Sequence, residues 1–299
     1  MNLNDLTIGI VFLLQSAVGI VGNFSVLSCY LIHYYNEQTL KTTDLILTHM
    51  FTANILIILS KGLLHTMRAF GMKGFITHFG CELLLYIQRL GRSMSIVTTC
   101  FLSVFQAITI NPGNSFGLIL KVKAPKHIVL LTSLFWKLYM SGNMIFPLYM
   151  YTKQNRNILA HESDMKYCSI SGNDALGSLL YTVLFVLPEI LLSVIIVWSS
   201  CSMVVTLYRH NQRVQHIRSS SVSFRTSPEY RATHRILTFV STFIGFHALS
   251  SILQGCIALI HNPHLWLLNI NAIISMCFPT LGPFLMSRDY TLQRLCFTE

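Results

Sequence analysis

The chain has 299 residues, of which 53% are hydrophobic and only 11% are charged. A soluble globular protein carries about 25% charged residues, so this chain has too few charges to cover a water-exposed surface. Its net charge of +10 does not indicate nucleic-acid binding, because the Lys and Arg residues lie in short segments between apolar runs. The composition therefore favours a membrane protein.

Seven segments are long and apolar enough to cross a bilayer as helices, which takes about 20 residues each. We expect an all-α membrane protein, a seven-transmembrane helix bundle that forms a single domain over residues 1–299. The predicted spans are residues 6–32, 44–64, 82–108, 128–149, 175–207, 236–260 and 265–286. The turn His261-Asn262-Pro263-His264 divides the last two, because Pro and Asn end a helix and favour a tight loop.

The loop charges predict the direction of the spans, because cytoplasmic loops are enriched in Lys and Arg. With the N-terminus outside, twelve of the 21 Lys and Arg residues are cytoplasmic and five are extracellular, while four lie within or at the edges of spans. We therefore expect an extracellular N-terminus and a cytoplasmic C-terminus. The segment Met1–Asp5 is acidic rather than basic, so no cleavable signal peptide is expected.

The chain has eight cysteines, and the predicted topology indicates which of them can form a disulfide. Only Cys81 and Cys168 fall in extracellular positions, at the start of the third span and in the second outer loop. Disulfides form in the oxidising compartment, and the other cysteines lie within spans or on the cytoplasmic tail. We expect one bridge, Cys81–Cys168, which would tether the second outer loop across the mouth of the bundle.

Four ionisable side chains lie at similar depth within the predicted spans: Arg89 and Arg92, Lys137, and Glu189, which follows Pro188. Charged groups are costly in a bilayer and usually face an interior cavity or a partner. Two interpretations stay open. The charges pair and tie helices together, or their surplus positive charge lines a pocket, open to the outside, that selects anionic or strongly polar molecules.

Motifs for catalysis are missing from the chain. It contains no His-Glu-x-x-His zinc site, no Gly-x-Ser-x-Gly elbow and no Gly-rich phosphate loop. The last lysine is Lys166, so a retinal Schiff base in the seventh span is excluded. We expect no enzyme activity, no metal and no cofactor. A small-molecule transporter is an alternative, which the lack of similarity between the two halves weakens.

Several landmarks resemble those of rhodopsin-like seven-helix receptors, namely Gly22-Asn23, Pro188 and the Cys81 to Cys168 pairing. Others depart from that pattern. The usual Asp-Arg-Tyr reads Phe105-Gln106-Ala107, the aspartate of the second span is Asn54, and the usual Asn-Pro-x-x-Tyr reads Phe278-Pro279-Thr280-Leu281-Gly282. These departures match one branch. Residues 53–62, 99–110, 207–217, 227–233 and 278–289 resemble, in order, the vomeronasal type 1 receptors.

The resemblance implies a G-protein-coupled receptor in the plasma membrane of a sensory neuron. It would bind a small pheromone-like ligand, anionic or steroid-like, in the outer half of the bundle and activate a heterotrimeric G protein. The residues expected to face the G protein are Gln106, Arg209, Arg213, Arg231 and Arg235. Those expected to take part in helix packing and activation are Asn23, Asn54, Pro188 and Pro279.

Two expectations qualify this picture. The chain's only glycosylation sequon, Asn23-Phe24-Ser25, lies inside the first span, so we expect an unglycosylated protein, unlike its relatives. A receptor relic that no longer signals remains an alternative, although the chain retains the family segments.

Overall fold

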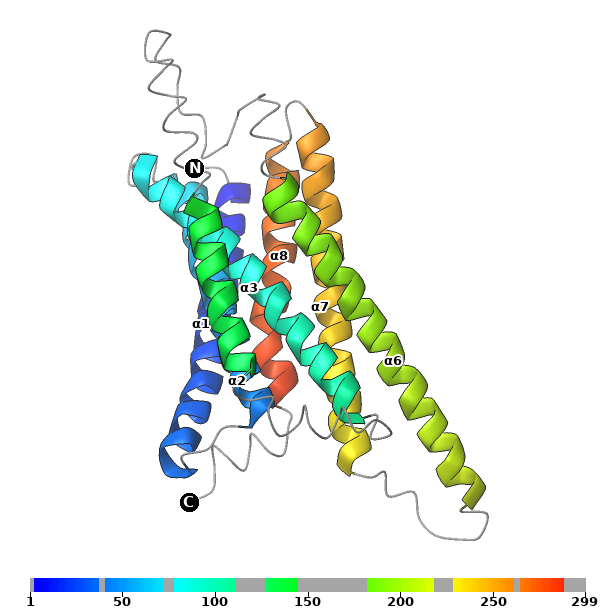
Figure 1. Cartoon of the computed structure of the whole chain (residues 1–299). Helices are drawn as coiled ribbons and strands as arrows, with labels where there is room; N and C mark the ends of the chain where they lie inside the picture. Colours follow the sequence, from blue (N-terminus) through cyan, green and yellow to red (C-terminus); the bar gives the residue numbers. More distant parts are fainter. Residues whose placement is uncertain are drawn as a thin grey trace.

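The computed structural model describes residues 3–37, 41–71, 78–110, 127–144, 182–217, 228–260 and 264–287. In chain order the helices are α1 (Leu3–Glu37), α2 (Thr42–Ala69), α3 (His78–Ile110), residues 127–144, η1 (Thr182–Val186), α6 (Leu187–Ile217), α7 (Pro228–Leu259) and α8 (Leu265–Ser287). They form one bundle, in which α1 begins at the upper end and α8 ends at the lower end (Figure 1). The described part of the chain contains no strand, so the predicted all-α fold is confirmed.

Six of the described helices are long and apolar enough to cross a membrane: α1, α2, α3, α6, α7 and α8. The helix of residues 127–144 is not among these six, and its inner side packs against Leu90 and Met94 of α3 and Ala53 of α2. Several helices extend beyond the predicted spans, because their end turns are polar and a hydropathy pattern does not register them. Residues 145–149 and 175–181 of the predicted spans lie outside the described residues.

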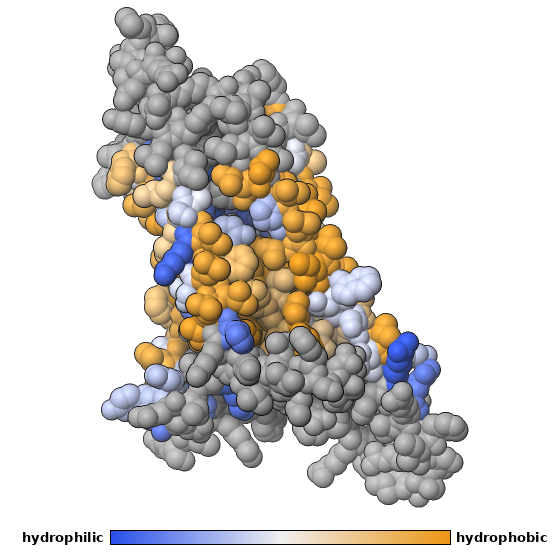
Figure 2. Space-filling model, viewed as in Figure 1, coloured by the Kyte–Doolittle hydropathy of each residue, from blue (hydrophilic) through white to orange (hydrophobic). Residues whose placement is uncertain are grey.

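The side chains are distributed as expected for a protein surrounded by lipid. Large apolar residues point outward, including Val21, Leu31 and Trp198, which are 66%, 69% and 78% exposed. Figure 2 shows the resulting band of hydrophobic surface between the two ends of the bundle. Polar side chains are buried instead, among them Asn23, Asn54 and Thr98, each 0% exposed. This arrangement fits a bilayer, where apolar groups tolerate the lipid and polar groups need partners inside the protein.

An apolar cluster joins the lower parts of the helices, near the end of α1 and the beginning of α2, which lie at the lower end of the bundle in Figure 1. Its aromatic centre is formed by Phe239 and Phe243 of α7 and Phe278 of α8. The ring of Phe278 makes edge-to-face contacts with Phe239 and Phe243, with centroid distances of 5.1 and 4.8 Å. The helices approach closely above it. A Cβ on Gly91 of α3 would lie 2.9 Å from the backbone oxygen of Ala53 in α2, so only glycine allows this contact.

Two prolines interrupt the backbone hydrogen bonding of α8, Pro279 and Pro283. Pro283 has no N–H, so the carbonyl of Pro279, four residues earlier, loses its donor within the helix. Asn23 of α1 supplies one, because its Nδ2 donates to Pro279 O at 2.9 Å as well as to Gly19 O at 2.7 Å. A buried amide thus satisfies a carbonyl that proline leaves open and ties α1 to α8.

The cysteines partly follow the expectation. Cys100, Cys201, Cys256 and Cys277 are free thiols, and Cys81 is disulfide-bonded. The expected partner, Cys168, lies outside the described residues, so the pairing itself stays a prediction. Cys29 is also disulfide-bonded, which corrects the expectation of a single bridge. The prediction considered compartment chemistry alone, whereas a bond also depends on which sulfur atoms the fold brings together.

Candidate functional site: a polar cavity between four helices

An ion pair between α3 and α6 lies in the interior of the bundle. Arg92 holds Glu189 through two parallel bonds, with Nε to Oε1 at 2.8 Å and Nη2 to Oε2 at 3.2 Å. The two side chains are 17% and 21% exposed, so they are shielded from solvent. Paired bonds of this kind fix the guanidinium and carboxylate planes relative to each other. The pair therefore orients Arg92 as well as neutralising it.

The local backbone explains where Glu189 lies. It is in the first turn of α6, which continues directly from the preceding helical turn. Pro188 precedes it and cannot donate a hydrogen bond to Leu184, and the five residues before α6 form the π-helix η1. The wider turn and the proline together set the position from which Glu189 points toward α3.

Helix α7 completes the coordination of Arg92. The Nη2 of Arg92 donates to Ser251 Oγ at 2.8 Å, and the Nη1 of Arg92 donates to Ser250 Oγ at 3.4 Å. Ser250 Oγ donates in turn to Asn271 Oδ1 of α8 at 3.4 Å. His247 Nε2 lies 3.9 Å from Glu189 Oε2. One arginine thus joins α3, α6 and α7 directly and α8 through a serine.

Lys61 of α2 enters the same region from the opposite side. It is 5% exposed, and its Nζ donates to Ser275 Oγ of α8. The Ser275 hydroxyl accepts this hydrogen bond and itself donates to Ala272 O at 2.8 Å. Among the residues that the structure describes, no carboxylate pairs with Lys61. The interior here carries two cations and one anion, and the uncompensated charge belongs to the lysine.

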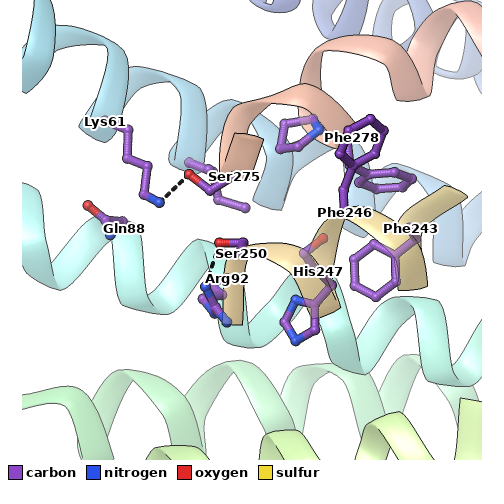
Figure 3. Close-up of a pocket in the computed structure, with 12 residues that line it drawn as sticks. Lys61, Gln88, Arg92, Phe243, Phe246, His247, Ser250, Ser275 and Phe278 are labelled. Carbon is purple, nitrogen blue, oxygen red and sulfur yellow. Dashed lines mark hydrogen bonds between the residues drawn. The ribbon is translucent and has the colours of Figure 1, made fainter. Parts of the chain in front are cut away.

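These side chains surround a cavity of about 40 Å³. Figure 3 shows Lys61, Gln88, Arg92, Ser250 and Ser275 on one side, with the aromatic rings of Phe243, Phe246 and Phe278 on the other. The full lining is Ile57, Lys61, Gln88, Arg92, Ser95, Phe243, Phe246, His247, Ser250, Ser275, Phe278 and Pro279. We call this space the polar cavity. It combines hydrogen-bond donors and one unpaired charge with an apolar wall, the usual composition of a small-molecule site.

The charged residues singled out from the sequence fall into three places. Arg92 and Glu189 meet at the polar cavity. Arg89 lies one turn away on α3, where its Nε donates to Leu85 O at 3.3 Å, and it does not line the cavity. Lys137 is exposed on the surface of residues 127–144. Lys61 was not singled out from the sequence, because it was placed at the edge of a span. The signal that could have identified it is a lysine within an apolar run, since such a charge needs a partner.

Of the four residues predicted for helix packing and activation, Asn23, Asn54 and Pro279 are linked to the polar cavity, and Pro188 precedes Glu189 in α6. Asn54 is fully buried and accepts from Ser95 Oγ at 3.5 Å, next to the cavity lining. Asn23 and Pro279 are hydrogen-bonded to each other, and Pro279 also lines the cavity. A continuous set of contacts therefore connects the cavity to the lower core.

The residues predicted to face a G protein lie near the lower end of the bundle. Gln106 is 9% exposed in the last turns of α3, and Arg209 is exposed near the end of α6. Arg213, Arg231 and Arg235 belong to α6 and α7, but their side chains lie outside the described residues. Within the described part of the chain, no group of three His, Cys, Asp or Glu residues is arranged to hold a metal ion.

Comparison with known proteins agrees with this architecture. Residues 6–298 match the vomeronasal organ pheromone receptor family. The chain is 46% identical to human vomeronasal type-1 receptor 4 over 284 residues, covering 95% of this chain and 94% of that receptor. It is 45% identical to human vomeronasal type-1 receptor 2, covering 95% of this chain and 72% of that receptor. A zebrafish olfactory receptor class A-like protein 1 is 26% identical over 295 residues, 97% of this chain and 92% of the relative.

These matches extend over nearly the whole chain and confirm the resemblance that its motifs indicate. They account for the helix of residues 127–144 as one of seven spans, although it is less apolar than the other six. The chain belongs to the vomeronasal organ pheromone receptor family, a family of seven-span membrane receptors.

Proposed function

We propose that this protein is a chemosensory receptor that binds a small anionic or strongly polar molecule in the polar cavity and activates a heterotrimeric G protein. The observation that carries the proposal is the charge arrangement of the cavity. Arg92 is neutralised by Glu189, whereas Lys61 is buried against a neutral hydroxyl. A buried cation without a counter-ion favours an anionic ligand group, because pairing offsets the cost of its desolvation.

The lining also suggests the remainder of the ligand. Phe243, Phe246 and Phe278 offer a flat apolar surface opposite the polar side chains. A rigid apolar body with one acidic group, such as a steroid sulfate, fits that division. The cavity of about 40 Å³ is far smaller than the roughly 300–1,000 Å³ of drug-sized sites, so the helices must separate to admit such a molecule.

That separation provides a route to signalling. A ligand shifts the equilibrium toward the arrangement that it binds better, and only by the difference in affinity. Insertion between Lys61 of α2 and Arg92 of α3 would change the spacing between these helices and their contacts with α7 and α8. The contacts through Asn54 and Pro279 would pass this motion to the lower core.

The lower end of the bundle is the proposed docking surface for the G protein, formed by Gln106, Arg209, Arg213, Arg231 and Arg235. This assignment requires an extracellular N-terminus and a cytoplasmic C-terminus, as the loop charges predict. We propose the plasma membrane of a sensory neuron as its location, on the basis of the receptors that it resembles. The predicted Cys81–Cys168 bridge would then lie above the cavity, on the extracellular side.

A calcium-imaging assay with a promiscuous G protein tests the proposal. Each of several steroid sulfates would be compared with the same steroid bearing a free hydroxyl. Charged hydrogen bonds are worth roughly 1.5–3 kcal/mol, so Lys61→Gln should weaken the sulfate response by about 10- to 150-fold. The response to the neutral steroid should change by less than about threefold.

Lys137→Gln is the matched control, because it removes the same charge from the exposed surface. It should leave both responses unchanged. A normal sulfate response from Lys61→Gln at equal surface expression would contradict the cavity assignment. Silence of the wild-type receptor toward every compound at normal surface expression would argue for a relic that does not signal.

A further inference from the structure

Lys137 occupies an unusual position for a charged residue of a membrane helix. It lies in the helix whose described residues are 127–144, within the predicted span of residues 128–149, which at 1.5 Å per residue is roughly 33 Å long and close to the hydrocarbon thickness of a bilayer. Along the helix axis, Lys137 is about 15 Å from His127 and at least about 10 Å from the other end, since the described helix continues to Met144. Its side chain is exposed on the surface of the bundle. The charge faces outward near the middle of the membrane.

Snorkelling does not relieve this position easily. A helical side chain leans toward the N-terminus of its helix, here toward His127. The four-carbon stem of lysine reaches roughly 6 Å, which is less than half of the way to that end. The side chain points away from the opposite end of the helix. A charge left in this place costs several kcal/mol unless a partner neutralises it.

The residues around Lys137 form a surface suited to close helix packing. Ser133, Lys137 and Ser141 are spaced by four residues and are all exposed, so they form one ridge of the helix. Leu134 and Leu138 flank the ridge and are 47% and 54% exposed. We call these five residues the Lys137 face. Small residues on such a ridge allow two helix backbones to approach within a bilayer.

Gly142 adds an independent observation. A Cβ at this position would meet no atom of the described residues within 4 Å, so their packing does not require the glycine. Glycine in the interior of a helix is unfavourable by about 1 kcal/mol relative to alanine. The opposite side of the helix is already used, because Phe135, Trp136 and Tyr139 pack toward α2 and α3. The unexplained small residues thus lie on or beside the outward surface.

A second copy of this chain is a poor occupant for the Lys137 face. A two-fold contact through this face would bring the two Lys137 side chains together, because such interfaces are self-complementary. At this depth the described spans offer no exposed carboxylate in exchange, because Glu189 is bound by Arg92. The other carboxylates whose side chains the structure describes lie near helix ends, at Asp5, Asp44 and Glu82. The charge of Lys137 is therefore best neutralised by an acidic group from a different protein.

We propose that the Lys137 face binds a transmembrane helix of another protein that carries an aspartate or glutamate at the depth of Lys137. The carboxylate pairs with the ammonium, and the helix packs along Ser133 and Ser141. The interaction neutralises a charge that lipid cannot solvate. It is separate from the ligand cavity, so it provides an assembly or trafficking contact rather than a sensory one.

A designed single-span probe tests the proposal while the natural partner is still unidentified. Three poly-leucine helices, carrying Asp, Asn or Leu at their centre, would be fused to a luciferase and expressed with the full-length receptor fused to a fluorescent acceptor. Polar contacts between helices in a membrane imply that the Asp probe half-saturates at a receptor level roughly 3- to 30-fold below that of the Leu probe. Lys137→Leu should abolish this preference, and Lys137→Arg should retain it.

A charge exchange keeps the test decisive if one variant folds poorly. The Lys137→Asp receptor should no longer prefer the Asp probe and should instead prefer a probe with a central lysine. Surface expression would be measured for each variant. Equal energy transfer for the Asp and Leu probes would overturn the proposal and favour lipid contact. A saturable receptor–receptor signal that Lys137→Leu removes, without an Asp preference, would also overturn it and assign the face to a second copy.

Discussion

Lys61 and Lys137 place the same ammonium group near the middle of the same bundle, in opposite surroundings. Lys61 is buried in the polar cavity and donates to Ser275, whereas Lys137 is exposed on the Lys137 face. The first charge is solvated by the protein, and the second is left for a partner to solvate. The role of a charged residue in the membrane therefore does not follow from its depth and residue type alone. It depends on whether its side chain points into the bundle or toward the lipid.

The strongest test of this contrast is the ion pair between Arg92, which lines the polar cavity, and Glu189. Glu189→Ala leaves Arg92 buried without its carboxylate, and losing one partner of a buried pair typically costs about 3–5 kcal/mol. We expect a large fall in the Tm of the purified receptor and little surface expression.

The exchanged variant Arg92→Glu with Glu189→Arg is the control, since it keeps one charge of each sign. It should recover part of the stability. If Glu189→Ala alone is as stable as the wild type, the pair does not hold α3 and α6 together, and the cavity charges are not structurally distinct from Lys137.

Asn23 gives the neutral counterpart of these charges. Asn23→Leu removes the donor that satisfies Pro279 O, and contacts of this type between membrane helices are worth roughly 0.6–2 kcal/mol. We expect a modest decrease in Tm, measured in the same detergent. A loss as large as that of Glu189→Ala would indicate that neutral polar contacts are as important as the charges in this bundle.

Lys61→Met separates stability from recognition in the cavity. The methionine keeps the stem and removes a charge that has no carboxylate partner in the described structure, so the Tm should stay constant or rise by about 2–4 °C. The response to a steroid sulfate should fall at the same time. A clear loss of stability would show that Lys61 serves to hold α2 against α8.

Lys137→Leu is expected to have the smallest effect on sensing. It removes a charge that does not line the polar cavity, so ligand sensitivity should remain within about twofold of the wild type, in line with other distant surface substitutions. Dose–response curves at matched surface expression check this. A tenfold shift would place Lys137 in the ligand site and remove the distinction between the two lysines.

Several features of this bundle follow from local sequence. Apolar runs of about 20 residues require helices in a bilayer, so the helical fold and the positions of the spans could be predicted. Arg92 and Glu189 could be singled out because charges in such runs need partners. The helix ends differ from the prediction, because α1, α6 and α7 continue into polar turns that hydropathy does not distinguish from loops.

The pairing of the charges could not be predicted in the same way. Arg89 and Arg92 are one turn apart on α3, yet Arg92 reaches Glu189 while Arg89 bonds to Leu85 O. Exchanging these environments would take a rotation of the helix by about 60° and a shift of about 4.5 Å along its axis. Contacts such as Gly91 against α2 fix both. Lys61 gained its importance from the approach of α8, which is distant in sequence.

The sequence by itself determined that this chain crosses the membrane as helices and that it resembles vomeronasal type 1 receptors, because both depend on residue type and order. Only the tertiary structure decided that Arg92 is neutralised, that Lys61 is left as the charge of the polar cavity and that Lys137 faces outward. The physical reason is that hydropathy fixes the depth of a residue in the bilayer, whereas helix rotation and packing fix its neighbours.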